Sequence, residues 1–87
     1  MYYIYLLKSR NKIYIGFTNN LEKRVKQHNN GENISTRHGI PWSLIYYEAF
    51  RSKSDAIQRE KKLKYHAKGL IELKKRITSS LDGNGEG

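Results

Sequence analysis

The stretch YIGFTNNLEKRVKQHNNG, residues 14–31, predicts a β-strand that runs through a short turn into a helix. β-Branched and aromatic residues at 13–17 favour the strand. We expect the helix to begin near Asn19, because asparagine is a good N-cap residue, and to end near Gly31, because glycine favours helix termination. This helix has an unusual distribution of side chains around its axis.

Charged and apolar residues share one face of the predicted helix. At about 100° per residue, Val25, His28 and Arg24 all fall within about 60° of Leu21, on the side that must face the protein. A guanidinium removed from water is costly without a partner. Either Arg24 bridges a carboxylate inside the fold, or this face borders a cleft.

A second helix shows the same feature with the opposite charge. It is expected to start around Ser52 to Ser54, where Ser52 and Asp55 form a candidate capping box, and to run to about Lys64. On it, Glu60 falls within the arc of Ala56 and Leu63. Two interpretations remain open: an internal Arg24–Glu60 ion pair, or a solvated cleft that holds a metal ion and a phosphate.

The remaining segments complete a small α+β fold. Residues 2–7 and 44–50 read as strands, and the first pairs with residues 13–17 in a hairpin. Residues 32–43 form a loop, and a last helix from about Leu70 carries an apolar stripe. The predicted order is ββαβαα, a three-stranded sheet flanked by helices, with one domain at residues 1–80 and a flexible tail at 81–87. The stripe consists of Leu70, Leu73, Ile77 and Leu81.

Tyrosines are concentrated on the two hairpin strands. Because side chains alternate along a strand, Tyr3 and Tyr5 share one face, and Tyr14 and Gly16 share a face of the second strand. An even number of residues in the hairpin loop would place Tyr5 and Tyr14 on the same side, and an odd number would separate them. Gly16 clears space above its strand, as close approach of a ligand would require.

The charge favours a polyanionic partner. The chain of 87 residues has a net charge of +9, and residues 51–76 hold ten basic and three acidic side chains, a net charge of +7. Such a field attracts nucleic acid by releasing counterions. We expect the outward-facing lysines of the second helix to contact phosphates. They are Lys61, Lys62 and Lys64.

The composition also bears on the compartment. There is no cysteine, and no apolar run approaches the roughly 20 residues that cross a bilayer. We therefore expect a cytoplasmic protein without a membrane partner. His38 and His66 are expected at the surface, because neither has the ligand spacing of a zinc site.

These residues resemble the GIY-YIG nuclease superfamily, in particular its small stand-alone bacterial members. Tyr3-Ile4-Tyr5 is similar to the first family motif and Tyr14-Ile15-Gly16 to the second. The segment TNNLEKRVKQHN resembles the family's helix, PWSLIYYE its third strand, and REKKLK the helix with the metal-binding glutamate. Five elements in order cover most of the chain. Two positions depart from the family pattern: Tyr3 replaces the first glycine, and Glu72 lies near where several relatives carry asparagine.

The resemblance implies a catalytic set and a cofactor. Glu60 would bind one Mg²⁺ or Mn²⁺ ion, Arg24 would hold a phosphate oxygen, and Tyr14 would act as general base toward water. Tyr5 would orient water or phosphate, and His28 would assist proton transfer or contact phosphate. Because an unperturbed phenol titrates near pH ~10, an alkaline optimum would fit a tyrosine base.

The implied function is that of a divalent-metal-dependent endonuclease that hydrolyses phosphodiester bonds in DNA. It would be structure-selective, with little base specificity, and would act in DNA repair or recombination, with a protein partner as one means of targeting. Two other classes stay open. The chain could be a noncatalytic nucleic-acid-binding module of the same fold, or a basic adaptor whose helices dock on an acidic protein.

Overall fold

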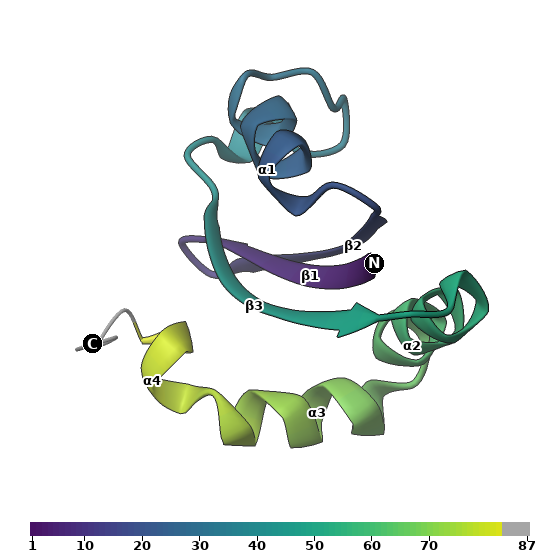
Figure 1. Ribbon diagram of the computed structural model, residues 1–87. Helices are drawn as coiled ribbons and strands as arrows, with labels where there is room; N and C mark the ends of the chain where they lie inside the picture. Colours follow the sequence, from purple (N-terminus) through teal and green to yellow (C-terminus); the bar gives the residue numbers. More distant parts are fainter. Residues whose placement is uncertain (83–87) are drawn as a thin grey trace.

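The computed structural model describes residues 1–82 as three strands and four α-helices in the predicted α+β arrangement (Figure 1). Helix α1 follows the hairpin, and helices α2 to α4 follow the third strand. A short 3₁₀ turn at Arg37–Gly39 lies in the loop before that strand. The bounds are β1 Tyr2–Ser9, β2 Lys12–Thr18, α1 Leu21–Asn29, β3 Ser43–Phe50, α2 Lys53–Tyr65, α3 Ala67–Arg76 and α4 Thr78–Leu81.

The sheet is antiparallel, with strand order β2-β1-β3. Ser9 pairs with Lys12, so the hairpin loop contains two residues, an even number. Tyr5 lies opposite Gly16 and Leu7 lies opposite Tyr14. The register therefore places Tyr5 and Tyr14 on the same face of the sheet, as the even-loop alternative required.

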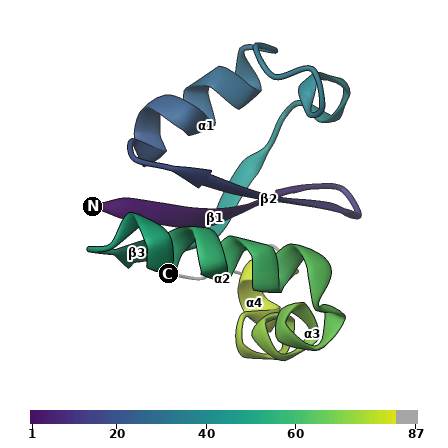
Figure 2. The same ribbon diagram turned by 90° about the vertical axis from the view of Figure 1, so that its right-hand side faces the viewer.

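Helices cover both faces of the sheet (Figures 1 and 2). On one face, Tyr5 and Leu7 pack with Trp42, and Leu21 and Val25 of α1 lie against this cluster. The opposite face carries the second apolar cluster, which α2 and α3 cover. It consists of Ile4, Leu6, Ile15, Ala56, Leu63 and Leu73. Alternation along β1 thus supplies both cores from one central strand.

The helix ends differ from the prediction by a few residues. Asn20, not Asn19, caps α1, because its side-chain oxygen accepts a 3.1 Å hydrogen bond from the backbone N–H of Lys23. The Ser52 hydroxyl oxygen accepts from the backbone N–H of Asp55 at 3.3 Å, which confirms Ser52 as the cap of α2.

The last predicted helix is two helices in the structure. It begins at Ala67 rather than near Leu70, and it is interrupted at Ile77 before α4. The apolar stripe is confirmed for three of its residues, since Leu73 of α3 is buried and Leu70 of α3 and Ile77, just after it, pack against the same apolar cluster. Of the predicted tail, residues 83–87 lie outside the described part of the chain.

A bidentate ion pair fixes α2 against the sheet. Arg59 donates from Nε and Nη2 to the two carboxylate oxygens of Glu48 on β3, at 2.9 and 3.0 Å, and Tyr46 donates to the same carboxylate at 2.5 Å. Although burial raises the pKa of Glu48, the hydrogen bonds from Arg59 and Tyr46 outweigh it and hold that pKa below its usual value. The Arg59–Glu48 ion pair fixes how α2 is rotated about its own axis, and so fixes the direction in which Glu60, the residue after Arg59, points.

None of the helices in residues 1–82 is long and apolar enough to cross a membrane.

Candidate active site

A chain of hydrogen bonds joins α1, β1 and the following loop. Arg24 donates from Nε to the Tyr5 hydroxyl at 3.4 Å, and the same hydroxyl lies 2.8 Å from His28 Nε2. His28 Nδ1 lies 2.7 Å from the hydroxyl of Thr36. Arg24 and His28 of α1 therefore both point toward the sheet, and Tyr5 on the central strand is hydrogen-bonded to both.

His28 is held as a neutral imidazole. It is completely buried, and burial followed by the positive charge of Arg24 lowers its pKa. Both of its partners are hydroxyl groups, which can donate or accept, so either neutral tautomer satisfies both ring nitrogens. The site thus contains an uncharged histidine at neutral pH.

Tyr5 is also removed from solvent, with no exposed surface. Burial raises its pKa to about 12, despite the opposing hydrogen bond from Arg24. Its ring lies directly over Gly16, where an added Cβ would overlap the ring and its hydroxyl. The expectation that Gly16 makes room for a ligand is therefore wrong: the glycine makes room for Tyr5.

Tyr14 lies on β2, at the edge of the sheet, and is only partly buried. Its ring centroid lies 4.9 Å from that of His28 in an edge-to-face arrangement and 6.3 Å from that of Tyr5. The ammonium of Lys64 lies 6.0 Å from the Tyr14 ring centroid. Of the two tyrosines, Tyr14 is therefore the one that solvent reaches.

Glu60 faces this edge from α2, and its partner is Lys64. The Lys64 ammonium lies 3.2 Å from Glu60 Oε2, and the Glu60 side chain is 19% exposed. Within residues 1–82 no ion pair joins Arg24 to Glu60, so the internal-pair interpretation is wrong. Lys64 is exposed, as predicted, but its ammonium also lies near Glu60 and the ring of Tyr14.

The donor set fits a hard divalent cation bound through one carboxylate. Residues 1–82 contain no group of three or more histidine, cysteine, aspartate or glutamate side chains that would make an all-protein cage. Mg²⁺ binds in the other way, with one or two carboxylates, several retained waters and substrate phosphate. Glu60, partly exposed at the sheet edge, meets that requirement.

Several residues that support the site were not predicted. Thr36 is 1% exposed and holds His28, while its carbonyl accepts a 2.7 Å hydrogen bond from Trp42 Nε1. Asn29 closes the loop by pairing with the backbone N–H and carbonyl of Trp42, at 2.7 and 2.9 Å. Gln27 accepts a 3.2 Å hydrogen bond from Arg24.

The family model described as the GIY-YIG catalytic domain matches residues 1–70. The chain belongs to the GIY-YIG family. The match spans the hairpin, α1, β3, α2 and the start of α3, and so contains every residue of the cluster described above. GIY-YIG domains are nuclease domains that generally depend on a divalent metal, and their substrate is nucleic acid.

Relatives of similar size carry the same GIY-YIG domain. The chain is 47% identical to UPF0213 protein CPE1444 of Clostridium perfringens over 77 residues, which covers 86% of this chain and 78% of that protein. It is 40% identical to UPF0213 protein SH2523 of Staphylococcus haemolyticus over 65 residues, 72% of this chain and 79% of the relative. The solution NMR structure of UPF0213 protein BH0048 from Bacillus halodurans superposes with a TM-score of 0.51 at 30% identity, over 84% of each chain.

Several other residues considered in the sequence analysis lie at the surface of the protein. Lys61 and Lys62 are exposed on α2, as expected for lysines that contact phosphate. Glu72 pairs with Lys75 at 3.6 Å, and its side chain is 60% exposed. His38 and His66 are also exposed, as predicted.

The buried His28 predicts a pH-dependent stability. An unfolded histidine takes up a proton near pH ~6.5, whereas the folded state resists protonation because the pKa of His28 is lowered. At low pH the unfolded chain therefore binds more protons than the folded chain. The free energy of unfolding should be at its maximum above about pH 7 and should decrease as the pH drops below ~6.5. Urea unfolding at a series of pH values measures this.

The control is His28→Gln, which keeps a hydrogen-bonding side chain but does not titrate. The exposed His38 and His66 are present in both proteins and so cancel in the comparison. The decline between about pH 7 and pH 5 should be shallower in the variant. Equal slopes would mean that His28 is protonated as readily in the folded chain as in the unfolded one.

Proposed function

We propose that this protein is a divalent-metal-dependent endonuclease that hydrolyses phosphodiester bonds in DNA. We propose further that it selects substrate by structure, reads bases little, and acts in repair or recombination. The observation that carries the proposal is the convergence of Tyr14, Arg24 and Glu60 at one edge of the sheet, around a buried Tyr5–His28 pair.

Arg24 is the candidate for holding the phosphate. It donates from Nε to Tyr5 and from Nη1 to Gln27, and a hydrogen bond with Tyr14 also raises its pKa. A guanidinium has five N–H groups, so donors remain for a phosphate oxygen. The hydrogen bond to Tyr5 raises its pKa further, so its charge is permanent. A guanidinium held at two points is preorganised to stabilise negative charge that develops on a phosphate oxygen.

Tyr14 is the candidate general base. It is the partly exposed tyrosine of the cluster, and the Lys64 ammonium lies 6.0 Å from the centroid of its ring. Acting as the phenolate, Tyr14 would accept a proton from the attacking water and become the phenol, while the new P–O bond forms and the P–O bond to the leaving oxygen breaks. Because Tyr5 has no solvent contact, we assign to it the positioning of Arg24 and His28 rather than direct contact with water or phosphate.

Glu60 would hold the divalent ion, which when bound supplies Lewis-acid stabilisation of the phosphate and leaving oxygens. The Lys64 ammonium lies 3.2 Å from the Glu60 carboxylate and balances its charge. Binding of a dication would therefore compete with the lysine, and it would free the ammonium for Tyr14 or for phosphate. Lys61 and Lys62 would contact phosphates further along the strand and add affinity without base specificity.

One observation favours the noncatalytic alternative. Glu72 stands near the position where several GIY-YIG relatives carry asparagine, and its carboxylate faces solvent rather than the cluster. A protein that kept the fold and the basic surface but lacked turnover would bind nucleic acid without cutting it. Metal-dependent turnover distinguishes the two functions.

The test is a cleavage assay with purified protein on single-stranded, duplex and branched DNA, with RNA of the same sequence alongside. We expect cleavage of at least one DNA substrate with Mg²⁺ or Mn²⁺ and none with EDTA. Binding to the same substrates is measured in EDTA by fluorescence anisotropy. Binding without cleavage of any substrate would establish the noncatalytic module instead.

A further inference from the structure

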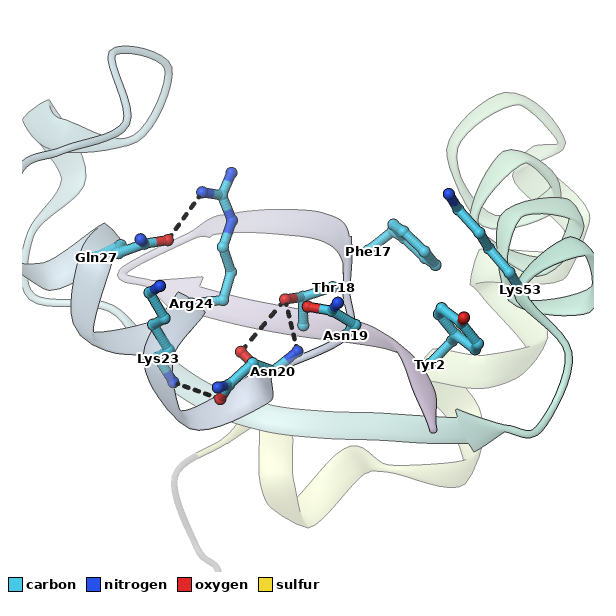
Figure 3. Close-up of a pocket in the computed structure, with 9 residues that line it drawn as sticks. All are labelled: Tyr2, Phe17, Thr18, Asn19, Asn20, Lys23, Arg24, Gln27 and Lys53. Atoms are coloured by element: carbon cyan, nitrogen blue, oxygen red, sulfur yellow. Dashed lines mark hydrogen bonds between the residues drawn. The ribbon is translucent and has the colours of Figure 1, made fainter.

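A cavity of about 400 Å³ opens beside the candidate active site, between the N-terminal ends of α1 and α2 (Figure 3). Its walls come from the start of β1, the end of β2 and both helices. Arg24 belongs to this cavity and, through Tyr5, to the catalytic cluster. The lining residues are Tyr2, Phe17, Thr18, Asn19, Asn20, Lys23, Arg24, Gln27 and Lys53.

One wall of the cavity is aromatic. The rings of Tyr2 and Phe17 are stacked, with centroids 6.2 Å apart and planes 7° from parallel. Both rings are only partly buried, although they border the apolar cluster beneath α2. Figure 3 shows the two rings and Lys53 together on one side of the cavity. Flat rings held in place by a core present a surface on which another planar group can stack.

The rest of the lining is polar and cationic. Lys53 stands beside the rings, and Lys23 and Arg24 lie across from it (Figure 3). None of the lining residues is acidic. Asn19 adds an exposed amide with donor and acceptor groups between the two sides. A site with an aromatic wall, three cations and no anion matches a planar base attached to phosphates.

We propose that this cavity binds one unpaired nucleotide of the substrate strand, next to the phosphodiester bond that Arg24 holds. The base stacks on the Tyr2–Phe17 wall, and Lys23 and Lys53 contact the flanking phosphates. The inference rests on the proposed function and narrows it. Bases inside a continuous duplex are stacked on both faces, so the substrate class is DNA with an unpaired nucleotide beside the cleavage point.

The test compares two single strands in EDTA by fluorescence anisotropy: an eight-nucleotide oligothymidine and the same backbone with abasic sites. Aromatic–base stacking contributes enough affinity for the wild-type protein to bind the intact strand about tenfold more tightly. Phe17→Leu and Tyr2→Leu should each remove most of that preference and leave the affinity for the abasic strand unchanged. Phe50→Leu makes the same change in the same apolar cluster but outside the cavity, and should retain the preference.

Lys53→Met supplies an independent measurement, because Lys53 is exposed and does not belong to the apolar core. The substitution should weaken the binding of both strands by the same factor, as the removal of a phosphate contact does. The proposal is overturned if the wild-type protein binds both strands equally. It is also overturned if the leucine variants keep the wild-type preference or lose affinity for both strands alike.

The test of the nucleotide site can be distinguished from the test of the nuclease function. Binding in EDTA requires no turnover, so base-dependent binding without any cleavage in Mg²⁺ would reject the nuclease and retain the nucleotide site. Cleavage of fully paired duplex as fast as of strands with an unpaired nucleotide would reject the site and retain the nuclease.

Discussion

Glu60→Gln should reduce the rate of Mg²⁺-dependent cleavage by about a thousandfold or more, because it removes the proposed ligand of the metal ion. A thousandfold loss of rate corresponds to about 4 kcal/mol of transition-state stabilisation. Glutamine has nearly the same shape as glutamate but no negative charge. Within the described residues, Glu60 is the carboxylate that faces Tyr14 and Lys64. No neighbouring acid of the cluster can replace it as a ligand.

Three measurements define this result. Cleavage is followed at saturating Mg²⁺, Mn²⁺ affinity is measured by calorimetry, and thermal unfolding reports on the fold. The matched control is Glu72→Gln, the same change on an exposed side chain of α3. Glu72→Gln should retain activity and Mn²⁺ binding. If Glu60→Gln still cuts at the wild-type rate, Glu60 is not the metal ligand.

Tyr14→Phe should lower kcat by about 10²- to 10⁴-fold, the range typical of a lost general base. The change removes one oxygen and keeps the ring that packs edge-to-face on His28. Because Tyr14 is only partly buried and the change removes only the contact of its hydroxyl with Arg24, stability should change by about 1 kcal/mol or less. Single-turnover cleavage with enzyme in excess isolates the chemical step.

Tyr47→Phe is the matched control for this substitution. Tyr47 lies on β3, is 51% exposed, and points to the same face of the sheet as Tyr5, since the two residues pair across the strands. It should retain activity. If the Tyr14→Phe protein is fully active, another group must act as the general base. If both variants keep the DNA affinity of the wild-type protein, the loss of activity lies in the chemical step and not in binding.

The sequence predicted the fold well because its strongest signals are local. Alternation in residues 2–7 and 13–17, the N-cap preference of Ser52, and the helical period of Leu70, Leu73 and Ile77 each depend on near neighbours. The helical periodicity alone also predicted that Arg24 and His28 face the sheet. The exact helix starts differed, since several neighbouring residues can cap a helix almost equally well.

The contacts of the site were harder to predict because they depend on long side chains and on an irregular loop. A helical wheel places Glu60 and Lys64 one turn apart, but it does not decide whether the lysine extends to solvent or folds back on the carboxylate. Thr36 and Asn29 contribute through a loop with no periodic pattern. The sequence pattern around Gly16 does not reveal that the ring of Tyr5, its partner on the neighbouring strand, fills the space above the glycine.

The loop between α1 and β3 has a consequence for how such domains can vary in length. Its two ends are tied together by Asn29 and Trp42, and its middle supplies the hydroxyl of Thr36 to the imidazole of His28. An inserted residue between 30 and 41 would displace that hydroxyl and leave a buried ring nitrogen without a partner. Surface loops usually accept insertions, but this one behaves as part of the interior, and its length should be as constrained as that of the strands.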